Sequence, residues 1–462
     1  MRWRQTLPSI DGRPEAGVVS GIAVPISTSR VGRFQAIVVL ICVLVNAVDG
    51  YDILVMSFAA PAIAKAWSLS GSQLGMAFSA GLFGILVGTV VLSPWSDRFG
   101  RRPLVIGSLI LVSVGMVLSA LAPTLIIFLM TRALTGVGVG GLLSSTAVLV
   151  AEYAPDRHRS SAISLLGVGY SIGAMAGGLV ARWLLETFGW RSSFLAGACL
   201  SAFMLALVAV FLPESVDFLL ARRPNRALRQ LNRILRRMKC HEISTLPPCV
   251  ATVMKSRPGV GRLLDRKYRT RTLLTWSTFF LHLMGLYFLL SWTPKLLAVS
   301  TSTQSVAVHA GVALNIGGIV GSLAFSVLAP FFNLRKLTVF LFGITAIAMV
   351  LFGKGVTNPA LVLPLAIAVG MLSFGALAGI YSLAPTAYET ECRGTGVGWA
   401  LGMGRIGAMI SPFAAGVLLD TGSGGHALYT VFAVPFALAA VAVFMLGRSG
   451  LQIAMKQEIS PG

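Results

Sequence analysis

Twelve mainly apolar stretches alternate with polar segments along the 462-residue chain. A helix needs about 20 apolar residues to cross the hydrocarbon core of a membrane. The pattern predicts twelve membrane helices, at residues 34–58, 74–94, 103–121, 125–149, 161–185, 192–212, 272–293, 306–329, 337–353, 359–384, 394–419 and 426–447. They fall into two groups of six, so we expect an all-α membrane protein made of two six-helix bundles.

The longer polar segments complete the domain organisation. Residues 1–33 are polar and basic and lack the apolar core of a signal peptide, so we expect a disordered cytoplasmic tail there. The two bundles are expected at 34–212 and 272–447. A basic central loop at 213–271 would join them, and a second cytoplasmic tail would follow at 448–462.

The composition excludes several classes of protein. With 55% hydrophobic and 11% charged residues, the chain differs from ordinary soluble domains. No ATP-binding loop or Ser/His/Asp arrangement points to an enzyme. No metal or cofactor is expected, because the cysteines have neither metal-site spacing nor the density of a disulfide framework. These cysteines are Cys42, Cys199, Cys240, Cys249 and Cys392.

The positive charge is distributed unequally between the two sides that twelve spans define. One side carries 30 Lys and Arg residues, 15 of them in the central loop, whereas the other side carries five. The positive-inside rule therefore places both termini in the cytoplasm. A net charge of +21 can indicate nucleic-acid binding, but here the charge follows the topology and no nucleic-acid partner is expected. We expect the basic loop to orient the protein and to meet anionic lipid.

The two halves show an internal repeat at an offset of 234 residues. Arg101-Arg102 matches Arg335-Lys336, and Arg159 matches Arg393. Ile172-Gly-Ala-Met175 also matches Ile406-Gly-Ala-Met409. Duplicated halves predict a substrate site near the midplane at their interface, with alternating access. In this alignment Ser171 occupies the position that corresponds to Arg405. The charge of Arg405 is therefore present in only one half, which makes a functional role more plausible than a structural one.

A charged loop follows the second stretch. Ser93-Pro-Trp-Ser-Asp-Arg-Phe-Gly-Arg-Arg-Pro103 combines an acid, a glycine and three arginines, which suits charge pairs that bridge helices in one conformation. The alternative is that these charged residues are solvated and serve only to set the orientation of the protein in the membrane. The segment resembles the Gly-x-x-x-Asp-Arg-x-Gly-Arg-Arg motif of the major facilitator superfamily, with Ser93 in place of the first glycine. The resemblance implies that fold and a gating role for the residues that match the motif, which are Asp97, Arg98, Gly100, Arg101 and Arg102.

Further segments resemble the aromatic acid:proton symporter branch of that superfamily. Asp49-Gly-Tyr-Asp52 is similar to its Asp-Gly-Phe/Tyr-Asp motif. Other matching segments lie at 132–141, 151–155, 159–160, 212–215 and 393–407, so the resemblance covers nearly all of 34–447. It implies a monomeric carrier of a bacterial inner membrane that imports an aromatic carboxylate, such as benzoate or a hydroxybenzoate, together with protons.

Two aspartates in the first span need a physical reason, because each costs about 2.5–3.5 kcal/mol at the centre of a bilayer. Asn46, Asp49 and Asp52 recur at every third position and share one helix face that can point into a central cavity. Two carboxylates held close together away from water repel each other, which favours a proton on one of them. We predict proton coupling at Asp49 and Asp52 and substrate contact at Asn46. The alternative is a structural ion pair with Arg132 or Arg405. Gly50 would bring another helix or the ligand close to both aspartates.

The remaining candidates are single side chains on other spans. Arg405 is expected to bind the substrate carboxylate, because it offers a fixed planar cation and small residues flank it. Tyr381 and Trp399 are expected to contact an aromatic ring, with packing or an interfacial belt as the alternative. Glu152 is placed to pair with Arg101 or Arg102. Three further residues are weighed as follows: Arg132 as gate or structure, Arg393 as a gating residue, and His282 as an interhelical hydrogen-bond partner or, less favoured, a proton relay.

The sequence leaves other functions open. Another facilitator-type carrier, such as a drug:proton antiporter or a sugar or organic-acid porter, is the first alternative. Gly173-Ala-Met-Ala-Gly-Gly178 approaches the antiporter motif but has Ala174 where that motif has proline, and no sugar-porter Pro-Glu-Thr-Lys follows the last span. A membrane sensor that binds a ligand without moving it is weaker, because no sizeable soluble signalling segment is present.

Overall fold

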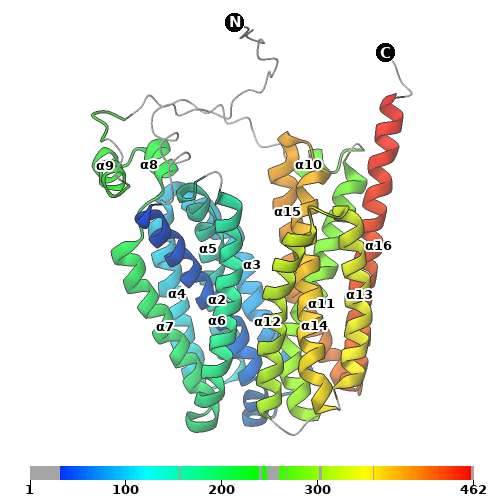
Figure 1. Ribbon diagram of the computed structural model, residues 1–462. Helices are drawn as coiled ribbons and strands as arrows, with labels where there is room; N and C mark the ends of the chain where they lie inside the picture. The colour runs from blue at the N-terminus through cyan, green and yellow to red at the C-terminus, as the bar shows by residue number, and fades with distance from the viewer. Residues whose placement is uncertain are drawn as a thin grey trace, which may run out of the picture.

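The computed structural model describes residues 32–155, 158–238, 242–246, 260–266, 268–300, 304–356 and 358–458, and its regular elements there are helices (Figure 1). Twelve helices in these ranges are long and apolar enough to cross a membrane. They are α2 (Arg33–Trp67), α3 (Gly71–Phe99), α4 (Arg101–Leu121), α5 (Leu125–Tyr153), α6 (Arg159–Phe188), α7 (Trp190–Phe211), α11 (Arg269–Ser300), α12 (Gln304–Leu328), α13 (Leu334–Gly355), α14 (Pro359–Leu383), α15 (Thr390–Asp420) and α16 (Gly425–Glu458). Three shorter helices lie between the two groups: α8 (Val216–Arg222), α9 (Ala227–Arg237) and α10 (Val260–Leu263).

The structure confirms the twelve predicted spans and the α-helical fold class, but several helices are longer than the apolar stretches. The helix α2 continues through Pro61 to Trp67, and α16 continues to Glu458, where a tail was expected. Apolar stretches mark the segment that lipid requires, whereas the backbone of a helix can continue into polar flanks. The predicted tail at 1–33 lies outside the described residues except for its last two positions.

Local sequence sets several helix ends. The Ser70 hydroxyl accepts a hydrogen bond from the Gln73 amide, and the Gln73 side chain accepts one from the Ser70 amide, which forms a capping box before α3. Gly100 ends α3 with φ of +104°, a backbone conformation that favours glycine. This turn places Arg101 and Arg102 as the first two residues of α4.

Glycines allow the membrane helices to approach closely in the same way in both halves. In the first half, a Cβ on Gly173 of α6 would collide with the Ala47 carbonyl of α2. At the repeat-related position, a Cβ on Gly407 of α15 would collide with the Phe280 carbonyl of α11. The matching Ile-Gly-Ala-Met segments therefore mark equivalent close helix contacts, as small residues commonly do in membranes.

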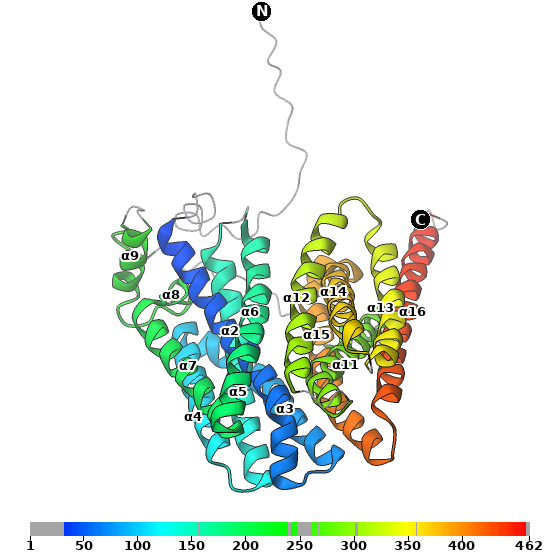
Figure 2. The same cartoon turned by 60° about the horizontal axis from the view of Figure 1, so that its bottom comes forward.

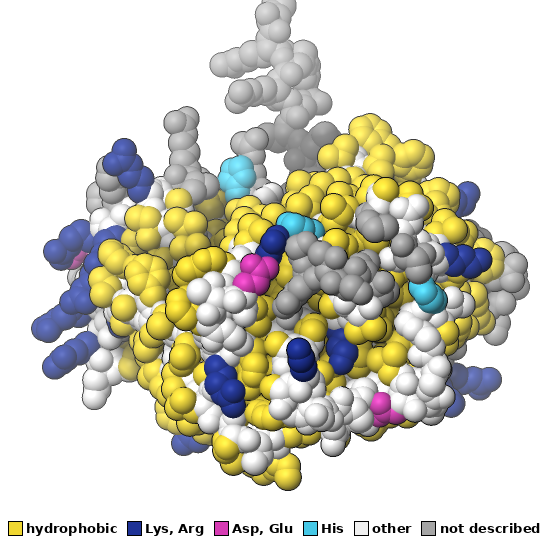
Figure 3. Space-filling view, turned by 90° about the horizontal axis from the view of Figure 1, so that it is seen from below, with side chains coloured by type: hydrophobic (Ala, Val, Ile, Leu, Met, Phe, Trp, Pro, Cys, Tyr) yellow, Lys and Arg dark blue, Asp and Glu magenta, His cyan; other side chains and the backbone are white. Residues whose placement is uncertain are grey.

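The two six-helix bundles stand side by side, and α6 of one faces α12 of the other (Figures 1 and 2). The start of α2, the end of α16 and the short helices α8, α9 and α10 lie at the same end, which we call the basic end. The ribbons of the two bundles converge toward the opposite end. Seen from that opposite end, scattered charged side chains lie among hydrophobic and uncharged ones (Figure 3).

Several contacts join the two bundles near the opposite end. The Ser57 hydroxyl of α2 donates to the Leu290 carbonyl of α11 at 2.8 Å. The Ser79 hydroxyl of α3 donates to the Met409 carbonyl of α15 at 2.7 Å. The ring of Phe78 also packs on Trp292, with centroids 5.6 Å apart. These residues hold the bundles together on one side of the midplane.

Candidate functional site

Charged side chains from both bundles approach each other near the middle of the membrane helices. Asp49 lies close to the midpoint of α2 and is 4% exposed, and Arg405 lies close to the midpoint of α15. Their charges interact, although no hydrogen bond joins the two side chains in the described structure. Arg405 Nη1 donates to the Tyr287 hydroxyl of α11 at 3.2 Å, which orients the guanidinium. The predicted acid and cation are therefore brought together.

Tyr170 of α6 belongs to the same group, although no sequence motif singled it out. Its side chain lies within electrostatic range of Asp49, Arg405 and Tyr287. Its hydroxyl is buried and has no hydrogen-bond partner among the described residues. A Cβ on Gly50 would collide with the Tyr170 carbonyl, so Gly50 is the residue that lets α6 approach α2 at this level. Of the two expected roles for Gly50, the structure shows the approach of another helix.

Tyr381 of α14 completes this group, which we call the central cluster: Asp49, Tyr170, Tyr287, Tyr381 and Arg405. The side chain of Tyr381 is 46% exposed and lies within electrostatic range of Arg405. Its ring packs edge-on against Phe279 at a centroid distance of 5.6 Å. The cluster thus combines one cation, one unpaired carboxylate oxygen and several aromatic rings at the junction of the bundles.

Asp52 has different surroundings from Asp49. Arg132 of α5 donates through Nη1 to Asp52 Oδ1 at 2.6 Å and through Nη2 to Oδ2 at 3.1 Å. Both side chains are buried, and the guanidinium also lies over the Phe194 ring at 5.6 Å. The structural ion pair considered for the first span is therefore present at Asp52. In contrast, Asp49 Oδ1 has no hydrogen-bond partner among the described residues.

Asn46 lies one turn from Asp49 toward the basic end and links α2 to α5. Its Nδ2 donates to the Cys42 carbonyl at 2.9 Å and to the Thr146 hydroxyl at 3.1 Å. The side chain is 6% exposed, so its amide group is held in a fixed orientation beside the aspartate.

Trp399 lies apart from the central cluster. It stacks on Trp276 with centroids 5.9 Å apart and an interplanar angle of 27°. Trp399 and Arg405 are six positions apart on α15, which corresponds to about 600° of helix rotation, or about 120° short of two full turns. Their side chains therefore point about 120° apart. Trp399 instead shares its face with the exposed Ile410 and Phe413. This placement matches the belt or packing alternative better than ring contact at the central cluster.

His282 of α11 does not make the interhelical hydrogen bond that was expected. The side chain is fully buried, and neither ring nitrogen has a hydrogen-bond partner among the described residues. Phe342 and Phe436 pack edge-on against the imidazole at centroid distances of 5.4 and 5.5 Å. Aromatic packing, which the sequence pattern does not reveal, replaces the polar contact.

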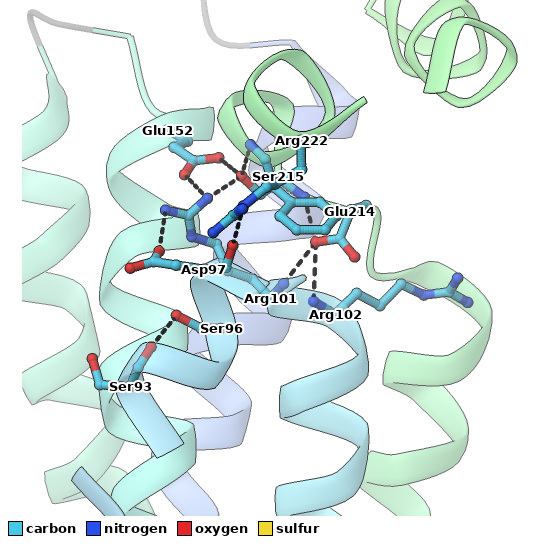
Figure 4. A network of polar contacts seen from close by, with 10 residues as sticks. Ser93, Ser96, Asp97, Arg101, Arg102, Glu152, Glu214, Ser215 and Arg222 are labelled. Atoms are coloured by element: carbon cyan, nitrogen blue, oxygen red, sulfur yellow. Dashed lines mark hydrogen bonds and ion pairs between the residues drawn. The ribbon is translucent and has the colours of Figure 1, made fainter. Parts of the chain in front are cut away.

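A second polar site lies where α3, α4, α5 and α8 meet (Figure 4). We call it the basic-end network, and it consists of Asp97, Arg101, Arg102, Glu152, Glu214 and Ser215. Arg101 Nη1 lies 2.9 Å from Glu152 Oε1, so the expected ion pair is present. Arg101 Nη2 lies 3.7 Å from Asp97 Oδ1, although the Asp97 side chain is 70% exposed.

Glu214 and Ser215 join the segment before α8 to this network. Glu214 Oε1 accepts from the backbone amides of Arg101 at 2.8 Å and Arg102 at 3.2 Å, which are unpaired first-turn amides of α4. The Ser215 hydroxyl bonds both Glu152 and Arg101, and it also caps α8. Residues 212–215 stand out in the sequence as a family marker, but the marker does not reveal these contacts.

The remaining gating candidates lie around or outside this network. Gly100 forms the turn that presents Arg101, and a Cβ there would press on the Glu214 carboxylate. Arg98 lies over the Phe99 ring at 5.4 Å. Arg393 is exposed at the start of α15 in the other bundle, so the structure does not bring it into the network.

Asp420 forms an interaction between the bundles that the sequence did not predict. It ends α15, and its carboxylate accepts from the backbone amides of Gly71 at 2.6 Å and Ser72 at 2.8 Å. Those amides begin α3, where free N–H groups and the helix dipole favour an anion. A Cβ on Gly416 would also collide with the Gly71 carbonyl. The carboxylate of one bundle thus caps a helix of the other at the opposite end.

Comparisons with known proteins agree with this architecture. The family model described as Major Facilitator Superfamily matches residues 39–412. The 4-hydroxybenzoate transporter of Acinetobacter baylyi is 32% identical over 429 residues, which cover 91% of this chain and 93% of that protein. The gallate transporter of Pseudomonas putida is 30% identical, over 92% of this chain and 95% of that protein. A solved inward-open structure of the xylose transporter of Escherichia coli is 18% identical, with a TM-score of 0.72 over 89% of this chain and 96% of that one, and this likeness concerns the fold.

Proposed function

Because the chain belongs to the major facilitator superfamily, a family of membrane transporters, we propose that it imports aromatic carboxylates of the benzoate and hydroxybenzoate type by proton-coupled alternating access. The observation that carries the proposal is the pairing of one fixed cation, Arg405, with the unpaired carboxylate oxygen of Asp49 among tyrosine rings between the bundles. The two relatives named above, transporters of 4-hydroxybenzoate and gallate, support the aromatic part of it.

The central cluster suits an aromatic anion. A guanidinium binds a carboxylate through two parallel N–H donors, and Tyr287 holds the guanidinium of Arg405 in orientation. Tyr381 is 46% exposed and rests on the buried Phe279 ring, so its own ring is available to pack against a flat aromatic substrate. The unpaired Tyr170 hydroxyl can supply a further hydrogen bond to the substrate. Arg405 binds the carboxylate, and the tyrosines bind the ring.

Proton coupling follows from competition for Arg405. An ionised Asp49 attracts the guanidinium, so it opposes the approach of a substrate carboxylate to the same cation. A proton on Asp49 removes that negative charge, so proton and substrate bind together and leave together. Asp52 takes no part in this exchange, because it is already neutralised by two hydrogen bonds from Arg132.

We assign the basic end to the cytoplasm, because Lys and Arg concentrate in cytoplasmic loops. The arrangement of the helices then corresponds to a carrier closed on the extracellular side by contacts such as those of Asp420. Asp97, Arg101 and Glu152 would control the cytoplasmic side, since their ion pairs depend on how α3, α4 and α5 are placed. We assign supporting roles in the opening and closing of the carrier to five further residues, through their charge or, for the glycine, through the turn it forms: Arg98, Gly100, Arg102, Arg132 and Arg393.

Uptake into proteoliposomes tests this function. The purified chain is reconstituted, a pH gradient is imposed, and accumulation of labelled benzoate, 4-hydroxybenzoate and gallate is measured with and without a protonophore. We expect accumulation above the external concentration that collapses when the protonophore is added and that is much faster than the passive entry of the neutral acid into protein-free vesicles. Binding without accumulation would instead indicate a sensor. Accumulation that is unchanged by the protonophore would show that transport is not coupled to protons.

A further inference from the structure

Exposed arginines gather on α8 and α9 at the basic end, away from the central cluster. We call them the arginine patch: Arg222, Arg223, Arg226, Arg229, Arg233, Arg236 and Arg237, all of which are exposed. Two exposed acids lie near them in sequence, Asp217 and Glu242, and Glu242 pairs with Arg236 at 3.0 Å. The patch therefore carries a strong excess of positive charge.

The arginines point outward because the apolar face of α9 is already covered by protein. Ala227, Leu231, Ile234 and Leu235 recur at helical spacing and are each at most 5% exposed. An amphipathic helix that inserts into lipid needs a free apolar face. This helix instead uses its apolar face to attach to the bundle and leaves its cationic face for a partner. That partner must therefore be recognised by charge.

The position of α9 relative to the membrane identifies the partner. The Arg237 guanidinium lies over the ring of Phe34 at 5.7 Å, and Phe34 is in the first turn of the apolar span α2. The axis of α9 runs across the direction of the membrane helices, next to α8 and the start of α2 (Figure 1). The patch therefore lies at the end of the membrane-spanning helices, where we expect the lipid headgroups.

We propose that the arginine patch is a docking surface for anionic phospholipid headgroups of the leaflet at the basic end. Arginine binds phosphate through two donors at once, and basic residues next to a membrane span attract anionic lipid. The surface is separate from the substrate site, so lipid bound there does not compete with substrate.

The arginine patch is connected to the basic-end network through α8. Arg222 Nε, at the end of α8, donates to the Asp97 carbonyl at 3.0 Å. At the other end of α8, Ser215 bonds Glu152 and Arg101. Headgroups that hold α8 and α9 at the membrane surface therefore also fix α8 against the network. We expect transport to be faster in membranes that contain anionic lipid, a consequence that rests on the proposed function.

Lipid retention tests the docking surface without relying on transport. Wild-type chain and the variant R229Q/R233Q are incubated in micelles with equal phosphatidylglycerol and phosphatidylcholine, purified by gel filtration, and their bound lipid is quantified by mass spectrometry. The matched control R335Q/K336Q removes two exposed cations at the basic end of the other bundle. We expect phosphatidylglycerol to be enriched over phosphatidylcholine in wild type and control. In R229Q/R233Q we expect the affinity for phosphatidylglycerol to fall by about tenfold or more, so that less of this lipid is retained.

A charge-preserving variant and a soluble competitor complete the test. The variant R229K/R233K keeps the charge, so it should retain phosphatidylglycerol if the chain folds and the patch acts by charge. Inorganic phosphate at millimolar concentration should leave retention unchanged, because a mixed micelle presents several anionic headgroups to the patch at once. Equal retention in R229Q/R233Q and wild type, or full displacement by inorganic phosphate, would overturn the proposal. If the wild-type chain retains phosphatidylglycerol but takes up no aromatic acid, the proposed function is contradicted and the lipid-docking surface is not.

Discussion

Asp49 and Asp52 stand three residues apart in one helix, yet they have opposite surroundings. Position along α2 turns Asp52 toward Arg132 of the same bundle and leaves Asp49 facing Arg405 of the other bundle. An acid that is already paired contributes to structure, whereas a buried acid without a hydrogen bond can exchange a proton when its neighbours change. The two aspartates should therefore respond differently to the same substitution.

Replacing each aspartate by asparagine separates these roles. Asp49→Asn should abolish pH-gradient-driven uptake while leaving the melting temperature of the purified protein nearly unchanged. Asp52→Asn should lower the melting temperature, because an unpaired Arg132 in a buried site costs about 3–5 kcal/mol. Thermal unfolding in detergent and uptake in proteoliposomes measure the two effects. A melting temperature that falls as far in Asp49→Asn as in Asp52→Asn would contradict the assignment.

Arg405 can be tested by keeping its charge and removing its planar shape. Lysine cannot offer two parallel N–H donors, so Arg405→Lys should raise the apparent KM for 4-hydroxybenzoate by about tenfold or more. Tyr287→Phe removes the hydroxyl that orients the guanidinium and should have a smaller effect in the same direction. Initial uptake rates over a range of substrate concentrations measure both. An unchanged KM in Arg405→Lys would exclude Arg405 as the carboxylate ligand.

Among helices, the spacing between α2 and α6 determines where Tyr170 lies. Gly50→Leu would place a side chain against the Tyr170 carbonyl, so we expect separated helices and loss of uptake. Gly167→Leu is a matched control on α6, because a Cβ there would meet no atom within 4 Å. Uptake and membrane expression measured together distinguish a displaced site from a chain that fails to insert. Uptake by Gly50→Leu at the level of the control would show that this close approach is not needed.

Sequence patterns predicted the elements better than the contacts between them. Apolar length located all twelve helices, and the repeat aligned Gly173 with Gly407, because both signals are local or periodic. The structure then shows a close helix contact at each of the two glycines, which the sequence did not predict. Tyr170 was missed since its importance depends on a helix that comes more than one hundred residues earlier in the chain. Glu214 and Asp420 were missed for a further reason: their partners are backbone amides, which no sequence motif displays.

At the scale of the whole molecule, one part of the contact between the bundles at the opposite end lacks bulky side chains. Gly71 of α3 packs against Gly416 of α15, and the Asp420 carboxylate then reaches the first amides of α3. Close backbone approach makes the contact depend on the relative position of the two bundles, so rocking one against the other must break it. Opening this end therefore requires the Gly71 and Ser72 amides of α3 to lose their hydrogen bonds to Asp420.

Asp420→Asn should shift the carrier toward opening at that end, because a neutral amide accepts hydrogen bonds from helix N-terminal amides less strongly than a carboxylate does. Glu186→Gln is the matched control: Glu186 occupies the repeat-related position but pairs with Arg182 within α6. Spin labels at Ala66 and Ala427, on opposite bundles, report the separation by electron resonance once the native cysteines are replaced. We expect a larger population of long distances in Asp420→Asn than in Glu186→Gln. Identical distance distributions would mean that the glycine contacts hold this end closed without the carboxylate.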